Sequence, residues 1–232
     1  MSNPNADALP MNRSRMNVRT LTSLAMLTAI SYVVMLLSKM LPQISGFLQL
    51  DLKDTVICVG GFVFGPLAAA IVSIVVAVVE MFTYSDTGII GCIMNVLATV
   101  AFCCTASFIY KKHHTKKGAV LGLAVGTVVL TIVMILWNFL ITPIYMKIPR
   151  DVVTGMIPTV FLPFNLVKGG LNMAVILLIY KPVVNALRRA RLIPESAERQ
   201  PVASTRNAGF LLFAFALLAT FVTLALVLMG IL

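Results

Sequence analysis

The sequence predicts an all-α integral membrane protein, in which a bundle of six transmembrane helices is followed by an extra C-terminal transmembrane helix. Of its 232 residues, 59% are hydrophobic and 11% are charged, whereas a soluble domain carries about 25% charged residues. Apolar runs of about 20 residues, the length that crosses a bilayer, recur along the chain. A water-soluble fold is excluded because too few polar side chains remain to cover its surface.

Seven apolar segments are expected to be helical: 18–41, 54–64, 66–84, 88–110, 118–145, 156–186 and 208–231. The first is too long for the core of a signal peptide, so we expect it to persist as a helix after a cytoplasmic tail at 1–17. The second is short and is separated from the third by Gly65-Pro66, a turn signal. We therefore expect it to be tilted or to cross the membrane incompletely.

These segments divide the chain into a six-helix membrane domain and an appendage. The predicted domain covers residues 18–187. Residues 188–207 are charged and contain Pro194 and Pro201, which is typical of a flexible linker. The linker leads to 208–231, a segment without charged residues that is expected to form a peripheral helix.

Basic residues gather in three clusters between the apolar segments and account for the net charge of +10. The clusters precede the first segment, follow the fourth and end the sixth: Arg13, Arg15 and Arg19; Lys111, Lys112, Lys116 and Lys117; Lys181, Arg188, Arg189 and Arg191. The positive-inside rule assigns such clusters to the cytoplasm, and all three agree with a cytoplasmic N-terminus if the short second segment counts as a crossing. Nucleic-acid binding is a weaker explanation of the charge, because no basic stretch is interleaved with aromatic residues.

In this topology three loops face outward, at 42–53, 84–88 and 146–155. The first is rich in Gln, Gly and Pro, and the last carries Lys147, Arg150 and Asp151. Loops that lie together on one face are candidates for a lid over a binding site.

Polar side chains inside the predicted membrane helices are costly, since a charge at the centre of a helix costs about 2.5–3.5 kcal/mol on insertion scales. Helical spacing places Asn165, Lys168 and Asn172 on one face of the sixth segment. The same spacing aligns Asn138, Thr142 and Tyr145 on the fifth. The residues expected in the outer half of the bundle are Asn138, Thr142, Tyr145, Asn165, Lys168, Glu80 and Asn95.

This convergence predicts a polar-lined pocket that opens outward. Its amide and ammonium groups would suit a flat heterocycle with alternating carbonyl and N–H groups along one edge. The competing interpretation is structural, because Asn often joins membrane helices by hydrogen bonds. Both interpretations stay open for Asn95 and Asn172, and Lys168 has the alternatives of snorkelling or of pairing with Glu80.

Other features indicate helix packing rather than chemistry. Ala25 and Ala29 form a small-xxx-small pair that permits close approach of another helix. The pairs Gly61/Gly65 and Gly122/Gly126 have the same spacing and are expected to serve internal packing. The four cysteines, which have no metal-ligand spacing, are expected to be core residues: Cys58, Cys92, Cys103 and Cys104.

The sequence lacks a phosphate-binding loop, a nucleophile elbow and a His-Glu-x-x-His motif. We therefore expect that the protein binds no metal and no cofactor and has no enzymatic activity. In particular, we expect that this chain alone does not hydrolyse ATP.

The run Pro163-Phe164-Asn165-Leu166-Val167-Lys168-Gly169 resembles the Pro-Phe-Asn-x-x-Lys-Gly signature of riboflavin-specific S components, the RibU family of energy-coupling factor (ECF) transporters. Further segments fit the family in order: Ala25-x-x-x-Ala29, Leu50-Asp51-Leu52-Lys53-Asp54, Gly60 to Pro66, Trp137-Asn138 and Pro143-x-Tyr145. The resemblance spans roughly 17–190, so the linker and the seventh segment fall outside it.

The resemblance implies a six-helix S component of a bacterial cell membrane that takes up riboflavin from outside. It implies that Asn138, Asn165 and Lys168 bind the isoalloxazine edge, with the loop residues Leu48, Gln49, Leu50 and Asp51 near the ligand. It also implies docking through Ala25 and Ala29 on a membrane coupling subunit driven by two ATPase subunits. Two alternatives remain: an S component for another vitamin, such as thiamine or pantothenate, and a helical membrane enzyme or structural subunit.

Overall fold

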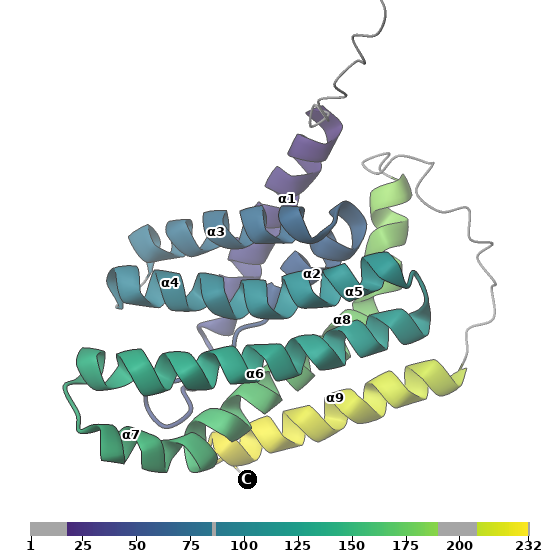
Figure 1. Ribbon diagram of the computed structural model, residues 1–232. Helices are drawn as coiled ribbons and strands as arrows, with labels where there is room; N and C mark the ends of the chain where they lie inside the picture. Colours follow the sequence, from purple (N-terminus) through teal and green to yellow (C-terminus); the bar gives the residue numbers. More distant parts are fainter. Residues whose placement is uncertain (1–17, 85–86, 190–207, 232) are drawn as a thin grey trace, which may run out of the picture.

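The computed structural model describes residues 18–84, 87–189 and 208–231, and these are almost entirely helical (Figure 1). The helices are α1 (Val18–Ser38), α2 (Lys53–Phe64), α3 (Pro66–Thr83), α4 (Gly88–Thr99), α5 (Thr105–Lys112), α6 (Lys116–Met146), α7 (Arg150–Met156), α8 (Leu162–Arg189) and α9 (Ala208–Leu228). The π-helical segment η1 (Val100–Cys104) joins α4 to α5, and η2 (Ile157–Phe161) joins α7 to α8. Six helical stretches of the described chain are long and apolar enough to cross a membrane, so the chain is a multi-pass membrane protein.

Each expected apolar segment coincides with a helix or a continuous helical rod. The predicted tail at 1–17, most of the linker, residues 85–86 of the second loop, and Arg13, Arg15 and Arg191 lie outside the described residues.

The third outer loop differs from the prediction. It was expected at 146–155, but α6 ends at Met146 and α7 begins at Arg150. The chain changes direction between α6 and α7 in a tight turn, in which Lys147 adopts a left-handed conformation with φ of 54°. Pro149 directly precedes α7, where its missing N–H costs nothing. Of the polar residues that suggested an open loop, Arg150 and Asp151 therefore belong to α7, whereas Lys147 lies in the turn. The loop 39–52 is left as the long connection at this end of the bundle.

The short helix α2 does not reach across a bilayer by itself. Its 12 residues rise about 18 Å, against about 30 Å for the hydrocarbon core. It begins at Lys53, whose ammonium contacts Glu80 near the end of α3, and Phe62 near its other end stacks on Tyr110 of α5 at 4.5 Å. The helix thus runs from the end of the bundle that contains Glu80 toward the end that contains the α5–α6 turn. The positive-inside argument, which counted the second segment as a crossing, required this direction.

Small residues allow the helices to approach closely, as predicted for Gly122 and Gly126. A methyl group added at Gly122 would lie 2.8 Å from the carbonyl oxygen of Ala106, and one at Gly126 would lie 2.8 Å from that of Phe102. The backbone of α6 therefore packs directly on η1 and α5. Of the cysteines, Cys58 and Cys103 are buried in the core, while Cys92 and Cys104 are partly exposed.

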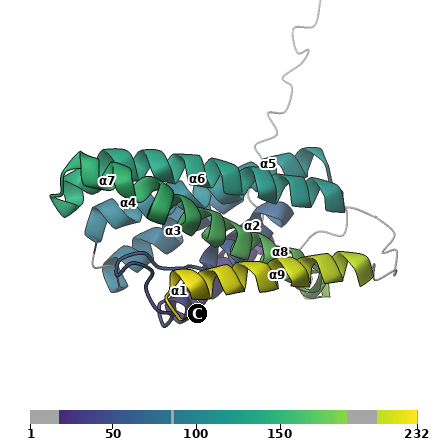
Figure 2. The ribbon, with the colours of Figure 1, turned by 90° about the horizontal axis from the view of Figure 1, so that it is seen from below.

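The two ends of the bundle differ in character. At one end lie the α5–α6 turn, with its four lysines, and the C-terminal part of α8, which is joined to α5 by contact between the hydroxyl groups of Tyr110 and Tyr180. At the other end lie the end of α3, the start of α4 and the α6–α7 turn (Figure 1). Helix α9 runs beside α8 (Figures 1 and 2).

Candidate functional site

A cavity of about 260 Å³ lies at the end of the bundle opposite the α5–α6 turn. It is lined by the end of α1, the loop 39–52, and residues of α3, α4, α6 and α8. Its apolar wall includes Met35, Leu41, Phe47, Leu48, Leu50, Met94, Ala98, Met134 and Phe164. Its polar residues are Ser38, Lys39, Gln43, Gln49, Asp51, Glu80, Tyr84, Thr87, Asn95, Asn165 and Lys168. A concave site in which apolar side chains and convergent polar groups meet is typical of a small-molecule site.

The loop 39–52 is folded on itself rather than open. A single β-bridge pairs Ile44 with Leu48 around a turn in which Ser45 and Gly46 have positive φ. The side chain of Gln49 donates to the carbonyl oxygen of Lys39 at 3.0 Å. These contacts give the loop a defined shape, in which Ile44 and Leu50 are buried and Met40 and Leu41 are exposed.

Buried Glu80 ties both ends of this loop to α3. Its carboxylate accepts from Lys53 Nζ at 2.9 Å and from Asn95 Nδ2 at 3.0 Å, and it pairs with Lys39 Nζ at 3.2 Å. Lys39 is the first residue of the loop, and Lys53 directly follows its last residue. One carboxylate therefore holds the two ends of the loop together, and Lys53 also pairs with Asp51.

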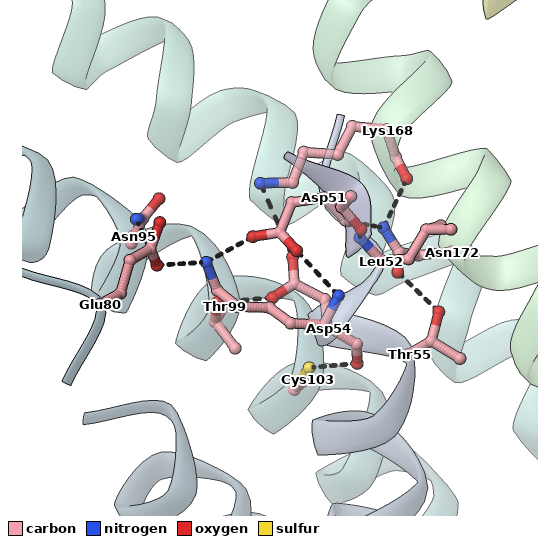
Figure 3. Close-up of polar contacts among 12 residues, drawn as sticks. Asp51, Leu52, Asp54, Thr55, Glu80, Asn95, Thr99, Cys103, Lys168 and Asn172 are labelled. Atoms are coloured by element: carbon pink, nitrogen blue, oxygen red, sulfur yellow. Dashed lines mark hydrogen bonds and ion pairs between the residues drawn. The ribbon is translucent and has the colours of Figure 1, made fainter. Parts of the chain in front are cut away.

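A second buried carboxylate, Asp54, lies beneath Lys168 (Figure 3). Asp54 Oδ1 accepts from the hydroxyl group of Thr99 at 2.6 Å. Its Oδ2 is buried, receives no hydrogen bond from the described residues, and lies 3.7 Å from Lys168 Nζ. Lys168 makes no hydrogen bond through its ammonium group to any described residue, so its three donors remain for a group in the cavity.

The ionic groups around the cavity balance. Three ammonium groups, from Lys39, Lys53 and Lys168, are paired with three carboxylates, from Asp51, Asp54 and Glu80. Buried charges are tolerated when they are paired in this way. The balance makes the site suitable for a ligand without net charge.

Asn95 and Asn172, for which the sequence left both a binding and a structural role open, have different roles. Asn172 accepts from Thr55 Oγ1 at 2.7 Å and donates to the carbonyl oxygen of Asp51 at 2.9 Å, so it joins α8 to the start of α2 (Figure 3). The structural interpretation therefore holds for Asn172. Asn95 combines both roles, because it donates to Glu80 and also lines the cavity. Lys168 pairs with Asp54 and not with Glu80, which was one of its alternatives.

Most of the site residues expected from the sequence line this cavity: Leu48, Gln49, Leu50, Asp51, Glu80, Asn95, Asn165 and Lys168. The buried Asn165 donates to the carbonyl oxygen of Phe161 at 2.8 Å, and its own carboxamide oxygen accepts no hydrogen bond from a described residue.

Three expected residues on α6 do not line the cavity. Asn138 is buried, donates to the carbonyl oxygen of Met134 at 2.7 Å and accepts from Thr142 Oγ1 at 2.9 Å. Tyr145 is 43% exposed on the outside of the bundle. The cavity residue on this helix is Met134, one turn before Asn138. A role of Asn138, Thr142 and Tyr145 in binding stays a prediction.

Sequence reasoning missed Lys39, Lys53, Asp54 and Thr99. The run Asp51-Leu52-Lys53-Asp54 contained the signal, because it places three charges at the entrance to an otherwise apolar helix. Such charges are expensive to bury without partners, and their partners come from α3, α4 and α8, which are remote in sequence.

Comparisons with known proteins agree with this architecture. The family model "ECF transporter, substrate-specific component" matches residues 19–184. The riboflavin transporter RibU of Staphylococcus aureus is 32% identical over 178 residues, covering 74% of this chain and 93% of that protein. The riboflavin transporter FmnP of Bacillus subtilis is 30% identical over 194 residues, covering 76% of this chain and 100% of that protein.

A solved structure described as the S component of a bacterial ECF transporter superposes with a TM-score of 0.62 at 32% identity. The match covers 75% of this chain and 100% of the chain in that solved structure. The family model covers more than half of the sequence, and two relatives reach 30% identity over most of their length. The chain therefore belongs to the substrate-specific components of ECF transporters, and its role is that of a transporter subunit rather than an enzyme.

Proposed function

We propose that this chain captures riboflavin at the outer face of a bacterial cell membrane and delivers it for ATP-driven uptake. The observation that carries the proposal is the meeting of Asn165 and Lys168 at the cavity, each with hydrogen-bonding capacity directed to no described residue. The isoalloxazine ring offers carbonyl and N–H groups along one edge, which match an amide oxygen and an ammonium group. Riboflavin carries no net charge, which suits the balanced ionic groups around the cavity.

The apolar wall supports the same ligand. Thioether and aliphatic side chains of Met35, Met94, Met134 and Leu50, with the ring of Phe164, surround the cavity. A flat aromatic ring gains free energy by leaving water for such a surface. Gln43 and Gln49 lie on the loop 39–52, where they suit the hydroxyl groups of a ribityl chain.

The family and the charge distribution support the proposed orientation and partners. The lysines of the α5–α6 turn lie at the end of the bundle remote from the cavity, and the positive-inside rule assigns that end to the cytoplasm. The N-terminus then lies in the cytoplasm and the cavity opens outward. Ala25 and Ala29 are exposed on α1, where they suit close packing with a helix of a membrane coupling subunit. ATP would be hydrolysed by two separate ATPase subunits.

A fluorescence titration of the purified full chain with riboflavin tests the proposal. Trp137 is the single tryptophan and packs, partly buried, against the core next to Asn138 on α6. Riboflavin bound in the cavity should quench its emission, and the purified protein should be yellow if the vitamin is retained. A parallel panel with thiamine and pantothenate distinguishes the other vitamins. Binding of either of these and not of riboflavin, or of none of the three, would refute the proposed ligand.

A further inference from the structure

Helix α9 has no role in the site described so far, and it lies beyond residues 19–184 that match the family model. Most of its surface faces outward, since 11% of its membrane-spanning window is buried. Its inner face nevertheless has two distinct contacts. The first part of the helix, through Phe210, Ala214 and Leu217, packs on the main core of the bundle. The last part packs on a separate cluster near the cavity.

This second group, which we call the outer apolar cluster, joins three segments of the chain. Its buried members are Ile44, Leu50, Phe164, Val167, Leu171 and Ala225, and Leu48, Leu52, Leu218, Phe221, Leu228 and Met229 pack around them. They come from the loop 39–52, from α8, and from α9 with Met229 directly after it. Figure 2 shows the end of α9 beside this loop.

Three members of the outer apolar cluster also line the cavity: Leu48, Leu50 and Phe164. These side chains therefore belong both to the lining of the cavity and to the cluster that contains residues of α9. Side chains in a close-packed interior hold one another in place, and removal of one is felt by its neighbours. The residues of α9 thus share one packed cluster with three residues that line the cavity.

The position of α9 against α8 is fixed by Phe221 and Gly170. A methyl group on Gly170 would lie 2.1 Å from Phe221 Cζ and within 2.4 Å of both Cε atoms. The ring of Phe221 therefore rests directly on the backbone of α8, in a space that a larger residue at 170 would close. This contact lies one helical turn from Ala225, which is buried in the outer apolar cluster.

We propose that α9 is a positioning element of the ligand cavity, in which Phe221 holds the loop 39–52 and Phe164 in their closed arrangement. The helix acts through the outer apolar cluster, without contact to the ligand, and it slows opening of the loop. The proposal rests on the proposed function for the identity of the ligand. It gives the appended helix a role in the rate at which the vitamin enters and leaves.

Two phenylalanines of α9 provide a matched test. Phe221 belongs to the outer apolar cluster, whereas Phe215 is 57% exposed on the outer surface of the same helix. Riboflavin association and dissociation are measured by stopped-flow fluorescence on the full chain in detergent or nanodiscs. Phe221→Ala should accelerate dissociation about tenfold, which corresponds to about 1.4 kcal/mol. Phe215→Ala should behave as the wild type, and Phe221→Leu, which keeps most of the apolar volume, should restore slow dissociation.

The readouts separate a positioning role from partial loss of folding. A misfolded fraction lowers the amplitude of the signal and leaves the rate constant of the remaining protein unchanged. If Phe221→Ala cannot be purified, Gly170→Ala displaces the same ring and should also accelerate dissociation.

Equal dissociation rates in Phe221→Ala, Phe215→Ala and the wild type would overturn the inference. A wild-type protein and a Phe215→Ala protein that both fail to bind riboflavin would instead refute the proposed function.

Discussion

Lys168 Nζ lies 3.7 Å from the buried Oδ2 of Asp54, an oxygen that has no hydrogen-bond partner in the described part of the chain. This pair joins α8 to the start of α2, two segments that are more than 100 residues apart. It explains how an ammonium group is kept in the lining of a cavity that is enclosed by the helix bundle. Removal of one partner from such a buried pair leaves an uncompensated charge.

Asp54→Asn should therefore lower the stability of the protein, because it leaves Lys168 charged without its partner. The expected loss is about 3 kcal/mol, measured by thermal unfolding in detergent. The side chain of Asn keeps an oxygen that can accept the hydrogen bond from Thr99, so the substitution removes the negative charge and leaves this hydrogen bond in place. Adding Lys168→Met should recover part of the loss, since both charges are then absent. A double variant that is no more stable than Asp54→Asn would show that the two charges are not coupled.

Glu80→Gln should release the loop 39–52. The substitution removes the carboxylate that pairs with Lys39 and Lys53 at the two ends of the loop. We expect faster trypsin cleavage at Lys39 and roughly tenfold weaker riboflavin binding, equivalent to about 1.4 kcal/mol. Asp151→Asn, which removes a negative charge from the exposed surface of α7, is the control. Unchanged cleavage and affinity in Glu80→Gln would argue against a role of Glu80 in holding the loop.

Asn165→Ala and Lys168→Ala should each weaken riboflavin binding by about 1–3 kcal/mol, the usual effect of leaving a buried polar partner unsatisfied. The titration of Trp137 emission described above gives the affinities. Gln43→Ala is a useful comparison because Gln43 lines the cavity from the loop, where water can replace its hydrogen bonds, and a smaller loss is expected. Wild-type affinity in both Asn165→Ala and Lys168→Ala would remove these residues from the binding site.

Asn138 tests whether the site rearranges. Its amide is engaged by Met134 and Thr142, and a contact with the ligand would require it to exchange these hydrogen bonds. We expect Asn138→Ala to weaken riboflavin binding by about 1–3 kcal/mol in the titration of Trp137 emission. If Asn138→Ala binds normally, the residue serves only the packing of α6.

Ala29→Trp should impair assembly with the coupling subunit without affecting ligand binding. Ala29 is exposed on α1, and a bulky side chain there would prevent the close helix approach that small residues permit. Co-purification with the other transporter subunits and riboflavin uptake by cells measure the effect. Leu67→Trp, at an exposed position of α3, is the matched control. Normal assembly of Ala29→Trp would place the docking surface elsewhere.

The sequence by itself determined the membrane class, the helical segments and the residues of one helix face. These follow from local chemistry: apolar length decides what crosses a bilayer, and helical periodicity places Asn165, Lys168 and Asn172 together on α8. The same information could not separate a ligand-facing asparagine from a packing one. Asn172 and Asn165 lie on the same face, yet the first bonds to Thr55 and Asp51 and the second lines the cavity.

Only the tertiary structure decided which charged side chains form ion pairs and which residues pack near the lining of the cavity. Glu80 is paired with Lys39 and Lys53, and Lys168 with Asp54, because helices remote in sequence pack side by side. The contact of Phe221 with Gly170 likewise depends on how α9 lies along α8. Periodicity describes which side of a helix is polar or small, whereas the neighbour of that side is set by the packing of the whole bundle.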